Sequence, residues 1–452
     1  MTGQKKQQVS MTEGVIWKQI LAFSLPLLIG NLFQQLYNTV DSIVVGNFIG
    51  SEALAAVGSS NPLINLIIGM FLGIATGAGV IISQYYGARD QEKLSWAVHT
   101  CIALSIMGGV LLTVLGVGVS PLILRLMGTP QEVMANSSVY LRIFFGGSLF
   151  NLVYNMGAGV LRAVGDSRRP LYYLCISSVV NILLDLLFVV VFGMGIAGVG
   201  YATVIAQAVS AMLVMWALLR TDDIYQVSVP RIRIDGRMMK RILALGIPSG
   251  IQQSIISLSN VIVQANINVY GASAMAGFGA YSKIDGFAML PLQSFAIAAT
   301  TFSGQNIGAG NRERVKKGIF QGIVLSMGYT LLISPFLYLN VNRILTVFSS
   351  DPEVIRYGGM TMRIMLFFYM TLAVHQILMG TFRGAGKTMV TMLIGIGNMC
   401  ILRMIYINLL VPYFPSYQAV LWCYPITWTT TMLMDIIYCV KAPWLPRFGE
   451  GE

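Results

Sequence analysis

Long apolar segments alternate with short polar connections along the whole chain. Twelve such segments can be distinguished, and the longest exceed the roughly 20 residues that a helix needs to cross a bilayer. Their apolar residues run on continuously instead of alternating with period two, which predicts spanning helices rather than strands. The predicted spans are residues 16–46, 53–83, 94–120, 132–161, 168–192, 195–220, 238–269, 276–303, 315–340, 353–382, 387–411 and 417–440.

The order of these segments repeats once within the chain. Gln84–Arg89 matches Gln305–Gly310, and Leu161–Gly165 matches Phe382–Gly386 at the same offset along the sequence. Each copy holds six spans, an even number, so both copies enter the membrane from the same side and the repeats are parallel. We therefore expect an all-α integral membrane protein of two six-helix lobes, related by a pseudo-two-fold axis along the membrane normal. The expected parts are an N-terminal tail at 1–15, a first lobe at 16–220, a linker at 221–237, a second lobe at 238–440 and a C-terminal tail at 441–452.

Composition and charge support this prediction. Of the 452 residues, 56% are hydrophobic and only 10% are charged, whereas soluble proteins carry about 25% charged residues. The net charge of +11 comes from Lys and Arg residues gathered in alternate connections. By the positive-inside rule, we expect both tails and the linker to be cytoplasmic. We expect a multi-pass protein of the plasma membrane. The positive charge is thereby explained by topology, and we expect no nucleic-acid partner.

Four polar positions in the first lobe form a candidate ion-coupling site. Asp41 lies in the first span, Asn181 and Asp185 lie one turn apart in the fifth, and Thr203 lies in the sixth. At 1.5 Å per residue, Asp41, Asp185 and Thr203 lie about 12–14 Å below the outer ends of their helices. Oxygen-bearing groups at one depth suit a proton or a small hard cation such as Na⁺, and an acid inside a membrane is costly unless it has a function. Desolvation and mutual repulsion favour the protonated form, so we expect the two carboxyls to titrate as a coupled unit. The alternative is that these are unrelated polar residues that serve packing.

Further polar residues within the spans are candidates for lining a substrate cavity. They are Gln34, Asn38, Gln207, Gln253, Asn260, Gln264, Lys283 and Asp285. Lys283 and Asp285 are two positions apart and do not share a helix face. One of them could face the cavity, and an ion pair between Asp285 and Arg403 is an equal alternative. We interpret Asp435 as a capping or snorkelling residue and His375 as structural.

Two apparent nucleotide-binding motifs fail on their context. Residues 193–198 fit GxGxxG, but they lie in a short external turn with no strand–helix unit around them. Gly386-Lys387-Thr388 resembles the end of a phosphate-binding loop, but Thr381 occupies the position of its first glycine. The chain has two histidines and lacks HExxH and GxSxG, so no catalytic constellation is present. We expect a transporter and not an enzyme, without a cofactor and with H⁺ or Na⁺ as the coupling ion.

Over nearly its whole length the chain resembles the multidrug and toxic compound extrusion (MATE) family. The resemblance rests on the Pro26 span with Leu36–Asp41, on Gln84–Arg89, on Leu161–Asp166, on the repeat and on the twelve spans. It implies secondary antiport of small organic compounds, often cationic or amphipathic, through a V-shaped, two-lobed bundle that works by alternating access. We expect this bundle to act as a monomer in the lipid bilayer.

The resemblance also bears on the site and on the alternatives. In prokaryotic members with a first-lobe site, the coupling residues match Asp41, Asn181, Asp185 and Thr203. A sodium-coupled branch adds acids in spans seven and ten, where this chain has apolar residues. The main alternative is a flippase for lipid-linked glycans from the same superfamily. The acidic charges of the first lobe and the count of twelve spans favour cationic substrates over that alternative.

Overall fold

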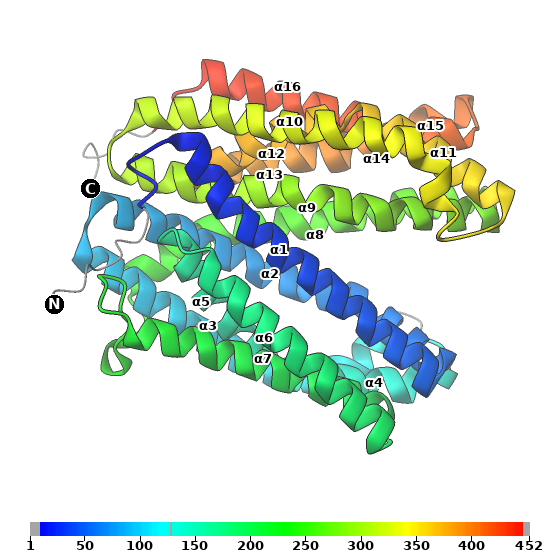
Figure 1. Cartoon of the computed structure of the whole chain (residues 1–452), viewed down its shortest axis with the longest axis horizontal. Coiled ribbons are helices and arrows are strands. Elements are labelled where there is room, and N and C mark those ends of the chain that lie inside the picture. The colour runs from blue at the N-terminus through cyan, green and yellow to red at the C-terminus, as the bar shows by residue number, and fades with distance from the viewer. Residues whose placement is uncertain (1–9, 127–128, 446–452) are drawn as a thin grey trace. The chain divides into compact units, whose positions relative to one another are not determined.

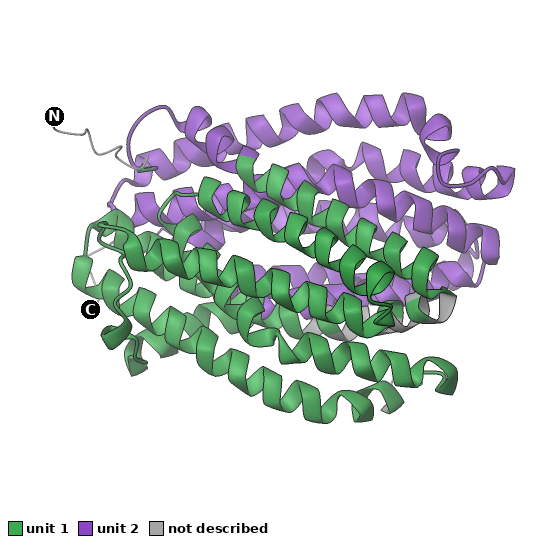
Figure 2. Cartoon of the chain, turned by 60° about the horizontal axis from the view of Figure 1, so that its bottom comes forward, with its two compact units in different colours: residues 1–10, 26–247 green, residues 11–25, 248–452 purple. Residues whose placement is uncertain are grey.

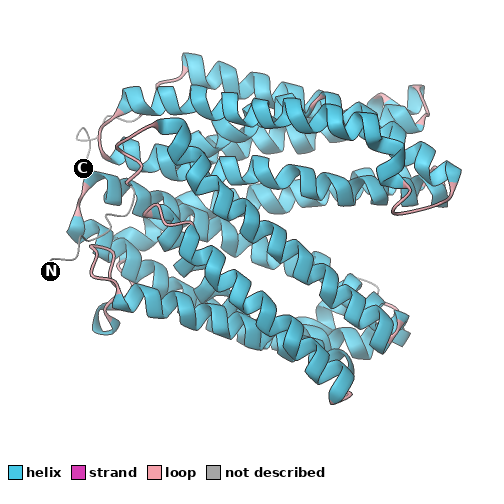
Figure 3. Cartoon of the chain, viewed as in Figure 1, coloured by secondary structure: helices cyan, strands magenta, loops and turns pink. Residues whose placement is uncertain are grey.

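The chain folds almost entirely into helices. A computed structural model of the protein describes residues 10–126 and 129–445, and within these ranges every regular element is a helix and none is a strand (Figure 3). Residues 1–9 of the predicted N-terminal tail and residues 446–452 of the predicted C-terminal tail lie outside the described residues. The all-helical class predicted from the sequence is therefore confirmed.

The elements follow one another as long helices joined by short turns (Figure 1). In the first half they are α1 (Ile16–Val44), the π-helix η1 (Val45–Ile49), α2 (Ser51–Ala88), α3 (Gln91–Leu126), α4 (Gln131–Gly146), α5 (Ser148–Ala163), α6 (Arg168–Asp185), the π-helix η2 (Leu186–Val191) and α7 (Gly195–Arg220). In the second half they are the short η3 (Val229–Arg231), α8 (Gly236–Asn268), α9 (Ala272–Gly308), α10 (Arg312–Leu345), α11 (Pro352–Phe367), α12 (Tyr369–Gly384), α13 (Thr388–Ile396), the π-helix η4 (Gly397–Leu402), α14 (Arg403–Leu409), η5 (Val411–Tyr413), α15 (Tyr417–Leu421) and α16 (Cys423–Lys441).

Local sequence explains where several of these helices begin. The Asn311 side chain accepts a hydrogen bond from the backbone N–H of Arg314 at 3.2 Å and caps α10. Asp351 caps α11 in the same way, at 2.9 Å from the Glu353 nitrogen, and Pro352 fills the first helical position. Both caps satisfy a backbone donor that a helix start leaves free.

The second half repeats the helix order of the first. α2 begins at Ser51, and α9 begins at the equivalent position of the second copy, Ala272. α4 and α5 meet at a bend of 48° around Gly147, and α11 and α12 meet at a bend of 53° around Phe368, which is the equivalent position by the same offset. The predicted internal repeat is therefore visible in the helices themselves, down to the position of a bend.

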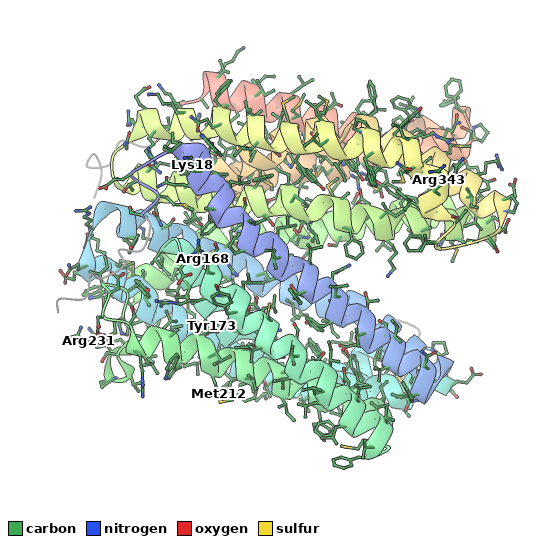
Figure 4. All side chains as sticks on the ribbon, in the orientation of Figure 1. Lys18, Arg168, Tyr173, Met212, Arg231 and Arg343 are labelled. Atoms are coloured by element: carbon green, nitrogen blue, oxygen red, sulfur yellow. The ribbon has the colours of Figure 1, made fainter. Side chains whose placement is uncertain are left out.

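The predicted spans coincide with these helices or with the bent pairs. By length and hydropathy alone, eight of the described helices could cross a membrane, or ten when each bent pair counts as one span. The two remaining predicted spans, residues 276–303 and 417–440, fall on α9 and on α15–α16. Large apolar side chains point out from the helices, as in Leu332 and Leu339 at 78% and 81% exposed and in Met212 of α7 (Figure 4). Such surfaces are stable in hydrocarbon and not in water.

The helices pack into two compact units that differ in their bounds from the predicted lobes. Of the described residues, unit 1 contains residues 10, 26–126 and 129–247, and unit 2 contains residues 11–25 and 248–445 (Figure 2). The start of α1 therefore packs within unit 2, where Arg314 donates a hydrogen bond to Gln19 at 2.8 Å and Met11 donates one to Gln305 at 3.0 Å. The predicted linker at 221–237 and the start of α8 pack instead within unit 1.

Candidate coupling site

Two acidic side chains of unit 1 meet inside the packed helices. Asp41 lies near the end of α1 and Asp185 is the last residue of α6. Asp185 is fully buried and Asp41 is half-buried, and their carboxyl groups lie near each other. Two ionised carboxylates repel each other and can only accept hydrogen bonds, so a hydrogen bond between these groups would require a bound proton.

The polar atoms of this pair and of Asn181 have no other hydrogen-bond partner among the residues that the structure describes. Both oxygens of Asp185, one oxygen of Asp41 and both side-chain polar atoms of Asn181 are buried without a hydrogen bond. Asn181 is 2% exposed, one helical turn before Asp185. Buried polar atoms in folded proteins are nearly always paired, and exceptions are typical of binding or functional sites. This cluster is therefore suited to receiving a proton or a cation.

A π-helical turn follows each of the two acids. η1 begins one turn after Asp41, η2 begins directly after Asp185, and η1 packs against both η2 and α7. π-helical turns are rare overall, but those that occur are often found at functional sites. The wider turn displaces the side chains beside it. Hydrophobic periodicity could not reveal these turns, since every position in them is apolar or glycine apart from Asn47.

Sequence reasoning missed two tyrosines beside the carboxyls. Tyr37 lies one turn before Asp41 on the same face of α1, and its hydroxyl interacts with the side chain of Gln34. Tyr140 of α4 is 7% exposed and lies near Tyr37 and both acids. The helical spacing between Tyr37 and Asp41 was a usable signal, whereas nothing in the sequence around Tyr140 pointed to the site.

The other predicted site residues of unit 1 lie on α1 and α7 but do not bond to the carboxyls. The hydroxyl of Thr203 donates to the carbonyl of Val199 at 3.0 Å, within its own helix. Gln34 and Asn38 are exposed, and Gln207 has a buried oxygen with no partner.

No strong charge balances the two acids from outside the pair. Within the described parts of the chain, no Lys or Arg forms an ion pair with Asp41 or Asp185, and no group of three or more His, Cys, Asp or Glu residues could hold a metal ion. The site consists of two carboxyls, an amide and phenol groups. Such a set of oxygen-bearing groups can take up a proton or hold one cation weakly.

In unit 2 the pairing of Asp285 with Arg403, which the sequence left as one of two alternatives, is wrong. Asp285 accepts hydrogen bonds from the hydroxyls of Tyr281, at 3.0 Å, and Tyr369. Arg403 is 1% exposed and lies over the ring of Tyr424, at 4.6 Å from its centroid. Hydroxyl groups therefore surround the carboxyl of Asp285, and an aromatic ring lies against the guanidinium of Arg403.

The remaining candidates of unit 2 divide between exposed and internally bonded side chains. Gln253 and Lys283 are exposed. Asn260 accepts a hydrogen bond from Arg403 at 2.8 Å, and Gln264 donates one to Asn268 at 2.8 Å. Of the cavity candidates on α8, Asn260 thus holds a buried cation of its own unit.

Asp435 is not a snorkelling or capping residue, and that prediction is wrong. Its carboxyl contacts the Nδ1 atom of His375 at 2.6 Å, and the side chains are 1% and 6% exposed. The pair joins α12 to α16 inside unit 2. Helical spacing could not reveal it, because the two residues lie on different helices that are far apart in the sequence.

The turn between η2 and α7 explains the GxGxxG spacing of residues 193–198. Gly193 and Gly195 both have positive φ, at 63° and 60°, a conformation that glycine adopts without strain. These glycines shape the tight turn into α7, and the GxGxxG spacing there is turn chemistry, as its sequence context predicted.

Comparison with known proteins identifies the family of the chain and supports its internal repeat. The MatE family model matches the chain twice, over residues 26–187 and 248–409, so that the two matches cover equivalent stretches of the two halves. The chain belongs to the MATE family. It is 34% identical over 395 residues to the probable multidrug resistance protein YoeA of Bacillus subtilis, covering 85% of this chain and 84% of that protein. It is 26% identical over 406 residues to the probable multidrug resistance protein NorM of Thermotoga maritima, covering 88% and 86%.

Solved structures of MATE proteins share the fold of this chain. An outward-facing multidrug resistance MATE transporter of the MOP superfamily superposes with a TM-score of 0.89 over 96% of this chain and 97% of that one, at 24% identity. A P26A variant of a MATE protein superposes with a TM-score of 0.90 at 23% identity, over 96% and 97%. The predicted resemblance to the MATE family is therefore confirmed, and the chain is a multi-pass membrane transporter of that family.

Proposed function

We propose that this protein is a secondary active exporter that moves small organic cations or amphipathic compounds out of the cell in exchange for H⁺ or Na⁺. The observation that carries the proposal is the pair of adjacent carboxyls of Asp41, half-buried, and Asp185, fully buried, which has no basic partner within the described residues. The curated relatives support the export role, since YoeA and NorM are named multidrug resistance proteins. Asn181 of α6 and Thr203 of the neighbouring α7 supply neutral oxygen atoms.

The coupling step follows from the charge of this pair. Outside, where pH is lower or Na⁺ is high, a bound proton or Na⁺ neutralises the carboxyls. The loaded site then has no attraction for an organic cation, which favours substrate release and return of the carrier. Inside, unloading restores negative charge and favours capture of the next cation. Because binding free energies are reciprocal, an ion that weakens substrate binding is itself displaced by substrate, and exchange results.

The test is transport of a fluorescent organic cation in proteoliposomes, with pH and Na⁺ gradients imposed separately. We expect Asp41→Asn and Asp185→Asn to abolish gradient-driven export, because Asn keeps the size of the side chain but cannot take up a proton. Asp90→Asn is the matched control, since Asp90 is a partly exposed acid that pairs with Lys93 at 3.7 Å near the turn between α2 and α3. Export at the parent rate by either membrane variant would refute the coupling role of the pair.

Binding of the same cation in detergent separates coupling from folding. We expect affinity to rise as pH rises in the parent protein, because deprotonation makes the site anionic. In Asp41→Asn and Asp185→Asn the pH dependence is expected to shrink, while size-exclusion profiles stay those of the parent. Transport of lipid-linked glycans without any ion gradient would instead support the flippase alternative. The working form that we propose is a monomer in the plasma membrane with both termini in the cytoplasm.

A further inference from the structure

A groove runs along one face of α10 in unit 2, remote in sequence from the coupling site. Its volume is about 1000 Å³. One wall is a single stripe of α10, and the other is the end of α16 with the turn that follows it. Among the described residues that line the groove there are two cations and no acid. The side chains that matter below are Arg312, Lys316, Ile319, Phe320, Ile323 and Trp444.

The groove is polar at one end and apolar along the rest. Arg312 and Lys316 occupy the first turns of α10, and Ile319, Phe320 and Ile323 follow on the same face at helical spacing. At 1.5 Å per residue, Ile323 lies about 16 Å deeper along α10 than Arg312. One leaflet of hydrocarbon is about 15 Å thick. The stripe thus reaches from the membrane surface to about the middle of the bilayer.

A buried tryptophan forms part of the wall of the groove opposite α10. The Trp444 ring is 4% exposed, packs edge-on against Phe382 with centroids 5.2 Å apart, and donates its N–H to the Cys439 carbonyl at 2.9 Å. Phe320, in contrast, is 70% exposed on the opposite wall. A buried Nη2 atom of Arg312 has no hydrogen-bond partner in residues 10–126 and 129–445. The groove therefore presents a free N–H donor of Arg312 at one end and the exposed ring of Phe320 two turns further along α10.

The repeat shows that the corresponding face of unit 1 is covered by the chain itself. There, His99 of α3 accepts a hydrogen bond from the backbone N–H of Ser228 at 2.9 Å, so residues of the connection after α7 lie along that face. At the offset of the repeat, Phe320 replaces His99 and Lys316 replaces Ser95. The histidine that binds a backbone N–H in unit 1 is thus replaced by an apolar ring in unit 2, and the serine one turn before it is replaced by a lysine.

We propose that this groove is a binding site for an anionic phospholipid. A phosphodiester would lie at Arg312 and Lys316, since a guanidinium matches two phosphate oxygens and an ammonium adds a point charge. One acyl chain would lie along Phe320 and Ile323, and the indole of Trp444 would form the wall at the interface. Basic pockets at the surface ends of membrane helices are the sites at which anionic lipid headgroups bind.

The two cations do not contribute equally. Lys316 shares its charge with Glu313 at 3.1 Å, in an exposed pair whose side chains are 61% and 74% exposed. Arg312 forms no ion pair within the described residues. Arg312 is therefore the main phosphate contact, and Lys316 is the weaker one.

The test is native mass spectrometry of the full-length protein in detergent, titrated with phosphatidylglycerol or with phosphatidylcholine of the same acyl chains. We expect the parent to bind phosphatidylglycerol more tightly. Arg312→Gln is expected to weaken that binding about 5-fold, and Arg312→Gln with Lys316→Gln by up to about 30-fold, at about 1 kcal/mol per cation. Phosphatidylcholine binding is expected to change little. Lys317→Gln is the matched control, because Lys317 is an exposed cation of the same helix turn that does not line the groove.

Phe320→Ala tests the apolar half, and we expect it to weaken both lipids alike. Equal binding of the two lipids by the parent would overturn the proposal, as would an Arg312→Gln effect no larger than that of Lys317→Gln. A further arm removes residues 446–452. If their removal raises phosphatidylglycerol binding, the chain's own C-terminal segment is the occupant of the groove and a lipid is not. Parent-like size-exclusion profiles and retained cation transport show that each variant is folded.

Discussion

The buried pair of His375 and Asp435 allows a quantitative test of the packing of unit 2. The Nδ1 and Oδ2 atoms are 2.6 Å apart, and neither side chain has more than 6% of its surface exposed. In His375→Leu the carboxyl of Asp435 would lose this contact and remain buried between α12 and α16. Breaking a buried pair by removing one partner costs about 3–5 kcal/mol, because the other group is left without compensation.

Removing both partners is expected to cost far less than removing either. An apolar pair of similar volume replaces a buried ion pair at little cost, or with a gain in stability. The double variant His375→Leu with Asp435→Leu should therefore recover most of the loss. The coupling energy from this double-mutant cycle is the quantity of interest, since it isolates the interaction from the packing of each side chain.

Thermal unfolding of the purified protein in detergent measures these effects. For units of about 200 residues, each kcal/mol shifts the midpoint by about 2–4 °C, so the single variants should unfold on the order of 10 °C earlier. Glu353→Gln is the control, because Glu353 and Arg356 form an equally short pair, at 2.7 Å, whose side chains are half exposed to solvent. Single variants as mild as this control, or a double variant no better than the worse single one, would refute the reasoning.

Two further perturbations test contacts that the fold requires. A Cβ atom at Gly77 of α2 would lie 2.5 Å from the backbone nitrogen of Gly246, which cannot rotate away, so Gly77→Ala should cost about 1–3 kcal/mol of unfolding free energy. Gly118→Ala, with nothing within 4 Å of the added atom, should leave the thermal midpoint unchanged, and equal midpoints for both variants would contradict the close approach. Arg403→Lys should lower the midpoint through a loss of about 2 kcal/mol, because an ammonium loses the planar stacking over Tyr424. An unchanged midpoint would show that the planar guanidinium is not needed there.

Much of the architecture could be predicted because each helix carries its own signal. A membrane span is recognised from a local run of apolar residues, and the repeat is recognised from residues at a fixed distance in the chain. The bends at Gly147 and Phe368 show how far this repetition extends, since the two breaks lie at equivalent positions although the residues differ. The meeting of Asp41 and Asp185 could be anticipated for a similar reason, because depth in a membrane can be counted along each helix separately.

Pairing between helices could not be predicted in this way. Helical spacing says which face a residue occupies, but not which neighbouring helix that face contacts. Arg403 was therefore one of two alternatives for the surroundings of Asp285, although the partners of this carboxyl are the hydroxyls of Tyr281 and Tyr369. Asp435 was placed at a helix end by its position in the sequence, whereas its partner lies on another helix. In each case the missing knowledge was the arrangement of helices around the charge.

The boundary between the two units could not be predicted from hydropathy and charge, and its position matters for bending of α1. Low hydropathy and charge placed the boundary in the connection at 221–237, but the packing changes within two helices, at Pro26 of α1 and Pro248 of α8. A proline cannot donate to the carbonyl one turn earlier, so Ala22 and Ala244 each lose one helical hydrogen bond. The backbone is thus loosened at the two points where a continuous helix passes from one unit to the other.

The two prolines are equivalent in the repeat, because the family model matches from Pro26 in one half and from Pro248 in the other. Bending at one proline therefore has a structural counterpart at the other. Asp41 lies on α1 beyond Pro26, within unit 1, so any bend at Pro26 leaves the pairing of Asp41 with Asp185 inside a single packed unit.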